Sequence, residues 1–144
     1  MVVEDSSSGT GQCLCGAVRY RYQGKPASVG LCQCRRCQRQ SGSAFLIGVV
    51  FPAEAVTIDG KLAVYEAAVH DGSRLWRHFC RTCGSAVMIT LDRFPQIRSM
   101  MGGTIDDPDI VQPSFSIWCS EGQGWLRLPE AITCFPDYPD GTFA

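Results

Sequence analysis

The sequence predicts a mostly β, single small domain organised around zinc-cysteine sites. Its 144 residues suit one domain, and a composition of 45% hydrophobic and 19% charged residues supplies enough apolar side chains for a packed core. The 15 glycines and 8 prolines disfavour long helices. The cysteines number 9, which is odd, so a complete disulfide framework would leave one thiol unpaired.

The chain is expected to consist of one tail and one folded unit. Residues 1–10 are expected to form a flexible N-terminal tail, because they include the run Ser6-Ser7-Ser8-Gly9. Residues 11–140 are expected to form the zinc-binding domain, since no internal repeat, low-complexity tract or linker interrupts them.

Short alternating or β-branched runs predict strands along the domain. Residues 17–22 alternate in character, as in a half-exposed strand, and residues 45–51 form an apolar run that ends at a proline. Residues 56–58 and 62–65 flank an Asp-Gly turn and are expected to pair as a hairpin. Four further strands are expected, at residues 75–79, 86–91, 97–101 and 115–118.

Residues 35–40 are the one stretch expected to be helical, for little more than one turn. They contain Arg35, Arg36 and Arg39, within and just after a cluster of cysteines. These arginines are candidates to bind the carboxylates of a substrate through bidentate hydrogen bonds. Alternatively, they belong to a solvated turn that offsets the negative charge of the nearby thiolates.

Charge and hydropathy predict where the protein works. The N-terminus contains Glu4 and Asp5 and has neither a basic nor an apolar region, so it does not resemble a secretory signal. The longest apolar stretch, residues 44–53, has about half the length of a membrane span. We therefore expect a cytoplasmic location, no membrane partner and reduced thiols. The net charge of −1 disfavours a nucleic-acid partner, and nothing in the sequence indicates the oligomeric state.

Seven of the cysteines form three tight clusters. Closely spaced thiolates can converge on one ion at about 2.3 Å from each sulfur, and a glycine after the second cysteine permits the tight turn of a zinc knuckle. Three such clusters in a reduced compartment indicate zinc rather than disulfides. The clusters are Cys13 and Cys15; Cys32, Cys34 and Cys37; and Cys80 and Cys83.

The number of ligands suggests two different sites. Four thiolates make a closed, structural site, whereas three leave a position for water or substrate, as in catalytic zinc sites. Spacing alone leaves the pairing of clusters open, because Cys119, Cys134 or a histidine could also be a ligand. Buried, inert thiols are the default interpretation of Cys119 and Cys134. His78 is either an ordinary strand residue, a hydrogen-bond donor to a metal ligand, or a fourth ligand itself.

The cysteine clusters and the residues around them resemble one family. The ordered signature is Cys-x-Cys-Gly-x-Val at residues 13–18, Cys-x-Cys-x-x-Cys at 32–37 with Ser-Gly-Ser-Ala-Phe at 41–45, and Phe-Cys-x-x-Cys-Gly at 79–84. Residues 103–108 and 116–118 resemble its C-terminal part. Over roughly residues 10–138, the chain resembles the glutathione-dependent formaldehyde-activating enzyme family, also called the CENP-V/GFA domain family.

The resemblance implies a β-tent of coiled small sheets, two zinc ions and a reaction. One zinc would be structural, on Cys13, Cys15, Cys80 and Cys83. The other would be labile or catalytic, on Cys32, Cys34 and Cys37. The reaction would be the condensation of glutathione with formaldehyde to S-hydroxymethylglutathione, formally a carbon–sulfur lyase reaction in reverse. The implied partners are a small-molecule thiol and an aldehyde.

Two other functions stay open. The first is a non-catalytic zinc-binding module that binds a protein or carries metal. The second is a redox sensor at the middle cluster, which would release zinc reversibly under mild oxidation. Metal stoichiometry with and without glutathione separates an enzyme from a module, because only the enzyme requires one mobile zinc.

Overall fold

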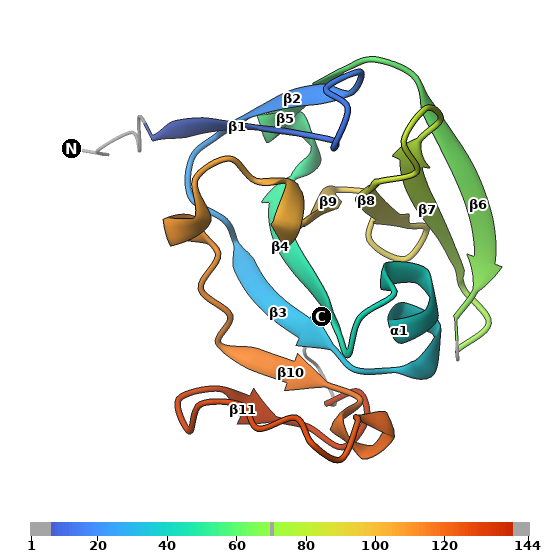
Figure 1. Ribbon diagram of the computed structural model, residues 1–144, viewed down its shortest axis with the longest axis vertical. Coiled ribbons are helices and arrows are strands. Elements are labelled where there is room, and N and C mark those ends of the chain that lie inside the picture. Colours follow the sequence, from blue (N-terminus) through green and yellow to red (C-terminus); the bar gives the residue numbers. More distant parts are fainter. Residues whose placement is uncertain (1–6, 70, 140–144) are drawn as a thin grey trace.

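A computed structural model describes residues 7–69 and 71–139 of the chain (Figure 1). The predicted mostly β, single-domain fold is confirmed. One α-helix, α1, spans Arg35–Ser41. The strands are β1 (Ser8–Gln12), β2 (Arg19–Gln23), β3 (Ser28–Cys32), β4 (Leu46–Pro52), β5 (Val56–Asp59), β6 (Leu62–Ala68), β7 (Arg74–Cys80), β8 (Ala86–Leu91), β9 (Ile97–Met101), β10 (Phe115–Ile117) and β11 (Thr133–Cys134). Short 3₁₀ turns are η1 (Ala53–Ala55), η2 (Gly102–Thr104), η3 (Pro108–Ile110) and η4 (Cys119–Glu121).

The strands form a small sheet and a large one. The small sheet has the order β1-β2-β5, and the large sheet has the order β11-β10-β3-β4-β9-β8-β7-β6. Strand β10 runs parallel to β3 and to β11, and the other pairings are antiparallel. In Figure 1 the large sheet curves from β10 and β11 at the bottom to β6 at the right, and the small sheet lies at the top. Helix α1 follows β3 and lies between the ends of β4 and β6 (Figure 1).

The predicted hairpin of residues 56–58 with 62–65 is wrong. Strand β5 pairs with β2 in the small sheet, and β6 pairs with β7 in the large sheet. Gly60, between the two strands, has φ 107°, and a Cβ there would lie 2.3 Å from the carbonyl oxygen of Ala17. The turn thus packs tightly against the chain before β2 and directs its two flanking strands into different sheets.

Strand β1 starts inside the tail expected over residues 1–10, of which residues 1–6 lie outside the described part. Gly9 and Gly11 stand opposite Tyr22 and Tyr20 on β2. A Cβ on Gly9 would lie 2.1 Å from the Tyr22 hydroxyl oxygen, and one on Gly11 would lie 2.2 Å from Tyr20 Cζ. The glycines therefore make room for the two tyrosine rings, which cover β1 and fix it in the sheet.

Two clusters of buried side chains hold the sheets together. The larger cluster joins the small sheet to β4 and β9, with Phe51 and Met100 fully buried and the Tyr22 ring stacked on Phe51 at 4.6 Å. The smaller cluster lies beside α1 and contains Cys34 and Cys37 together with aliphatic side chains of β4, β8 and β9. Packing of α1 against this cluster therefore fixes the positions of its cysteines.

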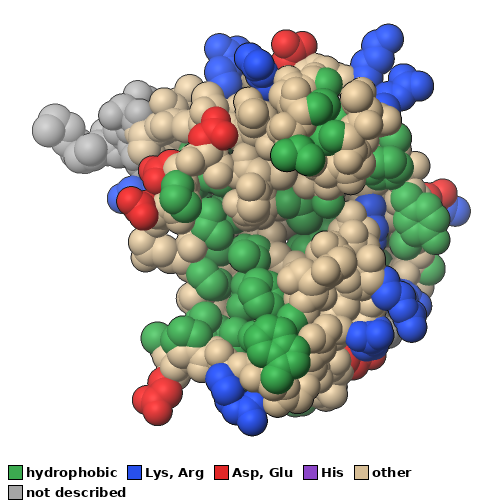
Figure 2. All heavy atoms as spheres, viewed as in Figure 1, with side chains coloured by type: hydrophobic (Ala, Val, Ile, Leu, Met, Phe, Trp, Pro, Cys, Tyr) green, Lys and Arg blue, Asp and Glu red, His purple; other side chains and the backbone are tan. Residues whose placement is uncertain are grey.

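Charged side chains lie mainly around the edge of the face drawn in Figure 2. Lysine and arginine side chains stand mostly at the top and right of this view, and acidic side chains mostly at the left. Hydrophobic side chains gather over β3 and β10. Among the described residues, none of the helices has the length and apolar character needed to cross a membrane.

Candidate metal centres and the adjoining cavity

The four cysteines predicted to form a closed site come together in the structure. Cys13 and Cys15 lie in the loop after β1, and Cys80 and Cys83 lie at the end of β7 and in the turn after it. Their four sulfur atoms all lie within 4.8 Å of one another. Sulfurs at the corners of a zinc tetrahedron with bonds of about 2.3 Å would be about 3.8 Å apart. The Cys13–Cys15 and Cys15–Cys80 sulfur distances are 3.7 and 3.8 Å, so this group fits zinc.

Backbone N–H groups in the two turns donate hydrogen bonds to sulfurs of this group. The glycines that follow each pair, Gly16 and Gly84, have φ of 79° and 77°, which lets the chain turn back over the sulfurs. The Val18 N–H donates to Cys13 Sγ at 3.3 Å, and the Thr82 N–H donates to Cys80 Sγ at 3.4 Å. Such bonds favour the thiolate over the thiol. The turns are therefore built for deprotonated cysteines, which are the form that binds metal.

Cys32, Cys34 and Cys37 form a second group at the start of α1. Cys32 ends β3, Cys34 is the N-cap of α1, and Cys37 lies one turn later, with its N–H donating to Cys34 Sγ at 3.3 Å. The three sulfurs lie within 4.8 Å of one another. In residues 7–69 and 71–139, no histidine, carboxylate or fourth cysteine joins this group. The grouping thus follows the split into four and three cysteines that the sequence suggests.

The thiols of this second group compete for protons. Hydrogen bonds from Cys32 and from Cys37 lower the pKa of Cys34 to about 2. The reverse contacts, first with Cys34 and then with Cys37, together with burial, raise the pKa of Cys32. Three neighbouring thiolates in a half-buried site repel one another strongly. A cation between them removes this conflict, and thiolate sulfur selects soft or borderline ions such as zinc.

Arg77 is a site residue that the sequence reasoning missed. It lies on β7, its side chain is only 6% exposed, and its Nη2 lies 3.7 Å from Cys37 Sγ. Its Nη1 donates to the side-chain oxygen of Gln40 at 3.4 Å. Among the described residues, no carboxylate lies within ion-pair distance of Arg77. A buried guanidinium needs a nearby negative charge, and Cys37 would supply it as the thiolate that binds metal.

The arginines predicted to bind carboxylates lie on the outer side of α1. The Arg35 guanidinium donates to the side chain of Gln38. The Arg36 guanidinium donates to the carbonyl oxygen of Ala68 at 2.6 Å, which links α1 to β6. Arg39 borders a shallow depression together with Arg35 and Gln123. Their role in binding substrate stays a prediction.

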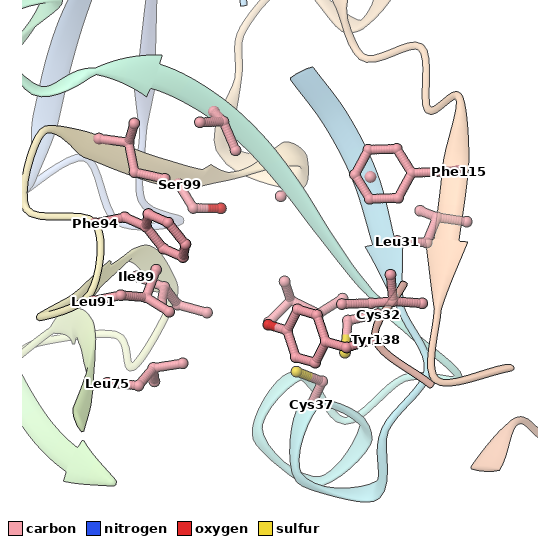
Figure 3. A pocket seen from close by; sticks show the side chains of 16 residues that line it. Leu31, Cys32, Cys37, Leu75, Ile89, Leu91, Phe94, Ser99, Phe115 and Tyr138 are labelled. Atoms are coloured by element: carbon pink, nitrogen blue, oxygen red, sulfur yellow. The ribbon is translucent and has the colours of Figure 1, made fainter. Parts of the chain in front are cut away.

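A cavity of about 130 Å³ adjoins the three-cysteine group. Six strands of the large sheet, from β3 to β10, contribute its walls, and the side chains of Cys32 and Cys37 form part of its lining. Figure 3 shows Cys32, Cys37 and Tyr138 close together at one end, with Ser99 and Phe115 across the cavity from them. The other lining side chains are aliphatic or aromatic, or are glycines. The cavity is therefore an apolar space that opens directly onto two of the candidate ligands.

Paired glycines shape this cavity. Gly30 on β3 lies opposite Gly48 on β4. A Cβ on Gly30 would lie 2.4 Å from the ring of Phe115, and one on Gly48 would lie 2.6 Å from Ser99 Oγ. Because no side chain stands at either position, Phe115 and Ser99 approach the strands closely.

Two aromatic residues adjoin the three-cysteine group. The rings of Trp118 and Tyr138 meet edge-to-face at 6.1 Å. Trp118 has φ 57°, the one positive φ at a non-glycine residue in the described part of the chain. Strained backbone of this kind persists where the surrounding structure holds it, and it often marks a functional site. Burial, followed by the nearby cysteine charges, raises the pKa of Tyr138 to about 12, so its hydroxyl keeps its proton at neutral pH.

The remaining candidate ligands lie outside both groups. His78 Nε2 and Thr90 Oγ1 form a hydrogen bond of 2.9 Å between β7 and β8. Cys119 Sγ accepts a hydrogen bond from Gln33 Nε2 at 3.4 Å and contacts the Cys134 thiol. The expected burial of the two thiols is wrong, because Cys119 is partly exposed and Cys134 is exposed. The hydrogen bond of His78 agrees with its interpretation as an ordinary strand residue.

Comparison with known proteins identifies relatives of this chain. Residues 8–121 match the family described as "Glutathione-dependent formaldehyde-activating enzyme". A protein of Halomonas elongata named "Putative glutathione-dependent formaldehyde-activating enzyme" is 29% identical over 144 residues, covering 93% of this chain and 90% of its own. A crystal structure of a Rhodobacter sphaeroides protein has the same fold, with a TM-score of 0.54 and 21% identity over 72% of this chain and 96% of that one.

Proposed function

Because the chain belongs to the glutathione-dependent formaldehyde-activating enzyme family, we propose that it is a zinc-dependent enzyme of the carbon–sulfur lyase type. It condenses a thiol such as glutathione with formaldehyde or a related aldehyde to an S-hydroxymethyl adduct. The observation that supports this most is the placement of the three-cysteine group at the wall of a cavity, since a purely structural metal site needs no adjoining space for a substrate.

We infer that the two cysteine groups have different roles. The group of four sulfurs would hold a structural zinc, because four thiolates complete a tetrahedron. Cys32, Cys34 and Cys37 would hold the second zinc. At this position, the metal would supply a coordination site at which a substrate thiol loses its proton.

The condensation requires no oxidant or reductant. The carbon–sulfur bond forms between the substrate sulfur and the carbonyl carbon, and the thiol proton ends on the carbonyl oxygen. The chain must therefore hold the two reactants together, stabilise negative charge on sulfur and deliver a proton to oxygen.

Residues beside the three-cysteine group suit these tasks. The Arg77 guanidinium beside Cys37 offsets negative charge on the sulfurs. The Tyr138 side chain borders the cavity, and its phenol group can donate a hydrogen bond to a carbonyl oxygen there. The walls of the cavity are mostly apolar, which lowers the local dielectric constant and strengthens both interactions.

Exchange spectroscopy by NMR tests the proposed function. The rate of adduct formation from glutathione and formaldehyde is measured at equilibrium, with and without the zinc-loaded protein. We expect faster exchange than in the spontaneous reaction, and the loss of this acceleration in Cys34→Ala. A protein that holds two zinc ions tightly and leaves the exchange rate unchanged would instead be a non-catalytic zinc module.

A further inference from the structure

We propose that the cavity beside Cys32 and Cys37 binds an apolar group of about six carbon atoms on one of the two condensing reactants. The group belongs either to the thiol or to the aldehyde. The inference rests on the proposed function for the identity of the reacting groups, and on the size, lining and position of the cavity for the apolar group.

The size of the cavity limits its occupant. Its volume is about 130 Å³. An apolar cavity of about 150 Å³ in another protein binds benzene. Formaldehyde has one carbon and fills only a small part of this space, whereas a charged tripeptide such as glutathione is too large to enter it whole. The volume therefore fits one small ring or a short branched chain.

The lining of the cavity selects against charge. Its lining includes no lysine, arginine, histidine or carboxylate side chain, and its polar side chains are Ser99, Tyr138 and the two cysteines. A carboxylate or ammonium group placed there would lose its hydration without gaining an ionic partner. The two carboxylates and the amine of glutathione would therefore have to stay outside. An apolar substituent gains by leaving water.

The arginines of α1 do not change this conclusion. Arg35 and Arg39 border their own shallow depression, and the Arg36 guanidinium is bonded to the backbone of β6. None of the three lines the apolar cavity in the described structure. The lining of the cavity therefore offers no cationic side chain to bind the carboxylates of glutathione.

The position of the cavity connects the apolar group to the reacting atoms. Cys32 and Cys37 lie at one end and Ser99 lies away from them (Figure 3). A ring in the cavity would thus place a sulfur or carbonyl carbon one or two bonds away at the cysteine end. The reaction stays balanced as before: the carbon–sulfur bond forms, and the thiol proton moves to the carbonyl oxygen.

A binding experiment tests the apolar site without requiring catalysis. Benzyl alcohol, which has neither a thiol nor a carbonyl group, is titrated into the zinc-loaded protein and followed by ligand-detected NMR, with glutathione disulfide as the comparison. We expect benzyl alcohol to bind about tenfold more tightly than the glutathione disulfide, which also lacks a free thiol. Equal or tighter binding of the disulfide would overturn the inference.

A variant whose new side chain fills the cavity provides a second test of the apolar site. Val50 lines the cavity from β4, so Val50→Phe places a ring in it. Val64, which is half-exposed on β6 and lies away from the cavity, gives the matched control Val64→Phe. We expect Val50→Phe to abolish binding of benzyl alcohol and Val64→Phe to retain it. Zinc stoichiometry shows whether each variant folds, and Ile97→Phe replaces Val50→Phe if that variant does not.

Three reactant pairs then identify the partner that carries the apolar group. Benzaldehyde with glutathione places the ring on the aldehyde, benzyl mercaptan with formaldehyde places it on the thiol, and glutathione with formaldehyde has no ring. Greater acceleration of one ring-containing pair, lost in Val50→Phe, supports the inference. Greatest acceleration of the pair without a ring, unchanged in Val50→Phe, refutes it. If no pair is accelerated, the proposed function is refuted. The binding of benzyl alcohol, compared with that of glutathione disulfide, then still decides whether the cavity binds an apolar group.

Discussion

The buried Arg77 allows a prediction whose magnitude follows from the structure. Replacement by methionine keeps an unbranched, apolar side chain of similar length and removes the positive charge. With an effective dielectric constant of about 20, unit charges separated by the 3.7 Å between Arg77 Nη2 and Cys37 Sγ attract by about 4.5 kcal/mol. Part of the lost attraction is offset, because the variant no longer bears the desolvation cost of a buried guanidinium.

We therefore expect Arg77→Met to weaken metal binding at the three-cysteine group by about 10- to 100-fold, which is about 1.4 to 2.8 kcal/mol. Competition with a chromophoric zinc chelator measures this affinity. The Cys34→Ala variant, which is expected to bind zinc at the four-cysteine group alone, supplies the reference titration curve for that group. Arg77→Lys keeps the charge without the planar fork and should recover part of the loss.

Arg74→Met is the matched control, because Arg74 lies on the same strand and its side chain forms an exposed ion pair with Glu66, at 3.3 Å. That variant should bind zinc as the parent protein does. Unchanged affinity of the three-cysteine group in Arg77→Met would refute the assigned role of Arg77. An equal loss at both groups would show that Arg77 supports the fold instead of the site.

Three further changes have distinct expected outcomes. Cys83→Ser should remove the structural zinc and reduce the free energy of unfolding by about 4 kcal/mol, which is the loss expected when a disulfide that closes a loop of similar length is opened. Chemical denaturation with and without chelator measures this loss. Cys34→Ala should bind one zinc instead of two while keeping the far-ultraviolet circular dichroism of the parent; loss of both zinc ions would contradict separate sites. Burial raises the pKa of Tyr20 to about 12, so the unfolded chain, whose tyrosines titrate near pH 10, loses its proton first. Stability should therefore fall between pH 10 and pH 12 by up to about 2.7 kcal/mol, and Tyr20→Phe should flatten this dependence in denaturation curves; an equal slope in both proteins would exclude Tyr20 as its source.

Local patterns in the sequence predict much of the fold. The runs at residues 86–91 and 97–101 coincide with β8 and β9, and the expected helical turn at residues 35–40 lies within α1. The three cysteine clusters were also accessible, because closely spaced thiols can be counted along the chain, although spacing left open which clusters share an ion. In each of these cases, the signal lies within a few neighbouring residues.

Features that depend on distant contacts could not be predicted in this way. Strand β1 contains Gly9 and Gly11, which disfavour strands locally, and it forms because tyrosines of β2 occupy the space above them. Arg77 lies 40 residues from Cys37, and only the packing of β7 beside α1 brings the two together. The apolar cavity likewise depends on the pairing of Gly30 with Gly48 between two strands.

The span of the four-cysteine group has a consequence for how the protein is made. Cys15 and Cys80 are 65 residues apart, and their sulfurs come together beside the small sheet only when β7 is in place. At a synthesis rate of about 5 to 20 residues per second, the first cysteine pair leaves the ribosome about 3 to 13 s before the second. During this interval, a zinc ion can find only half of its ligands. Completion of the fold therefore waits for late synthesis and for metal supply, and newly made chains in zinc-poor cells are expected to be the population that proteases remove.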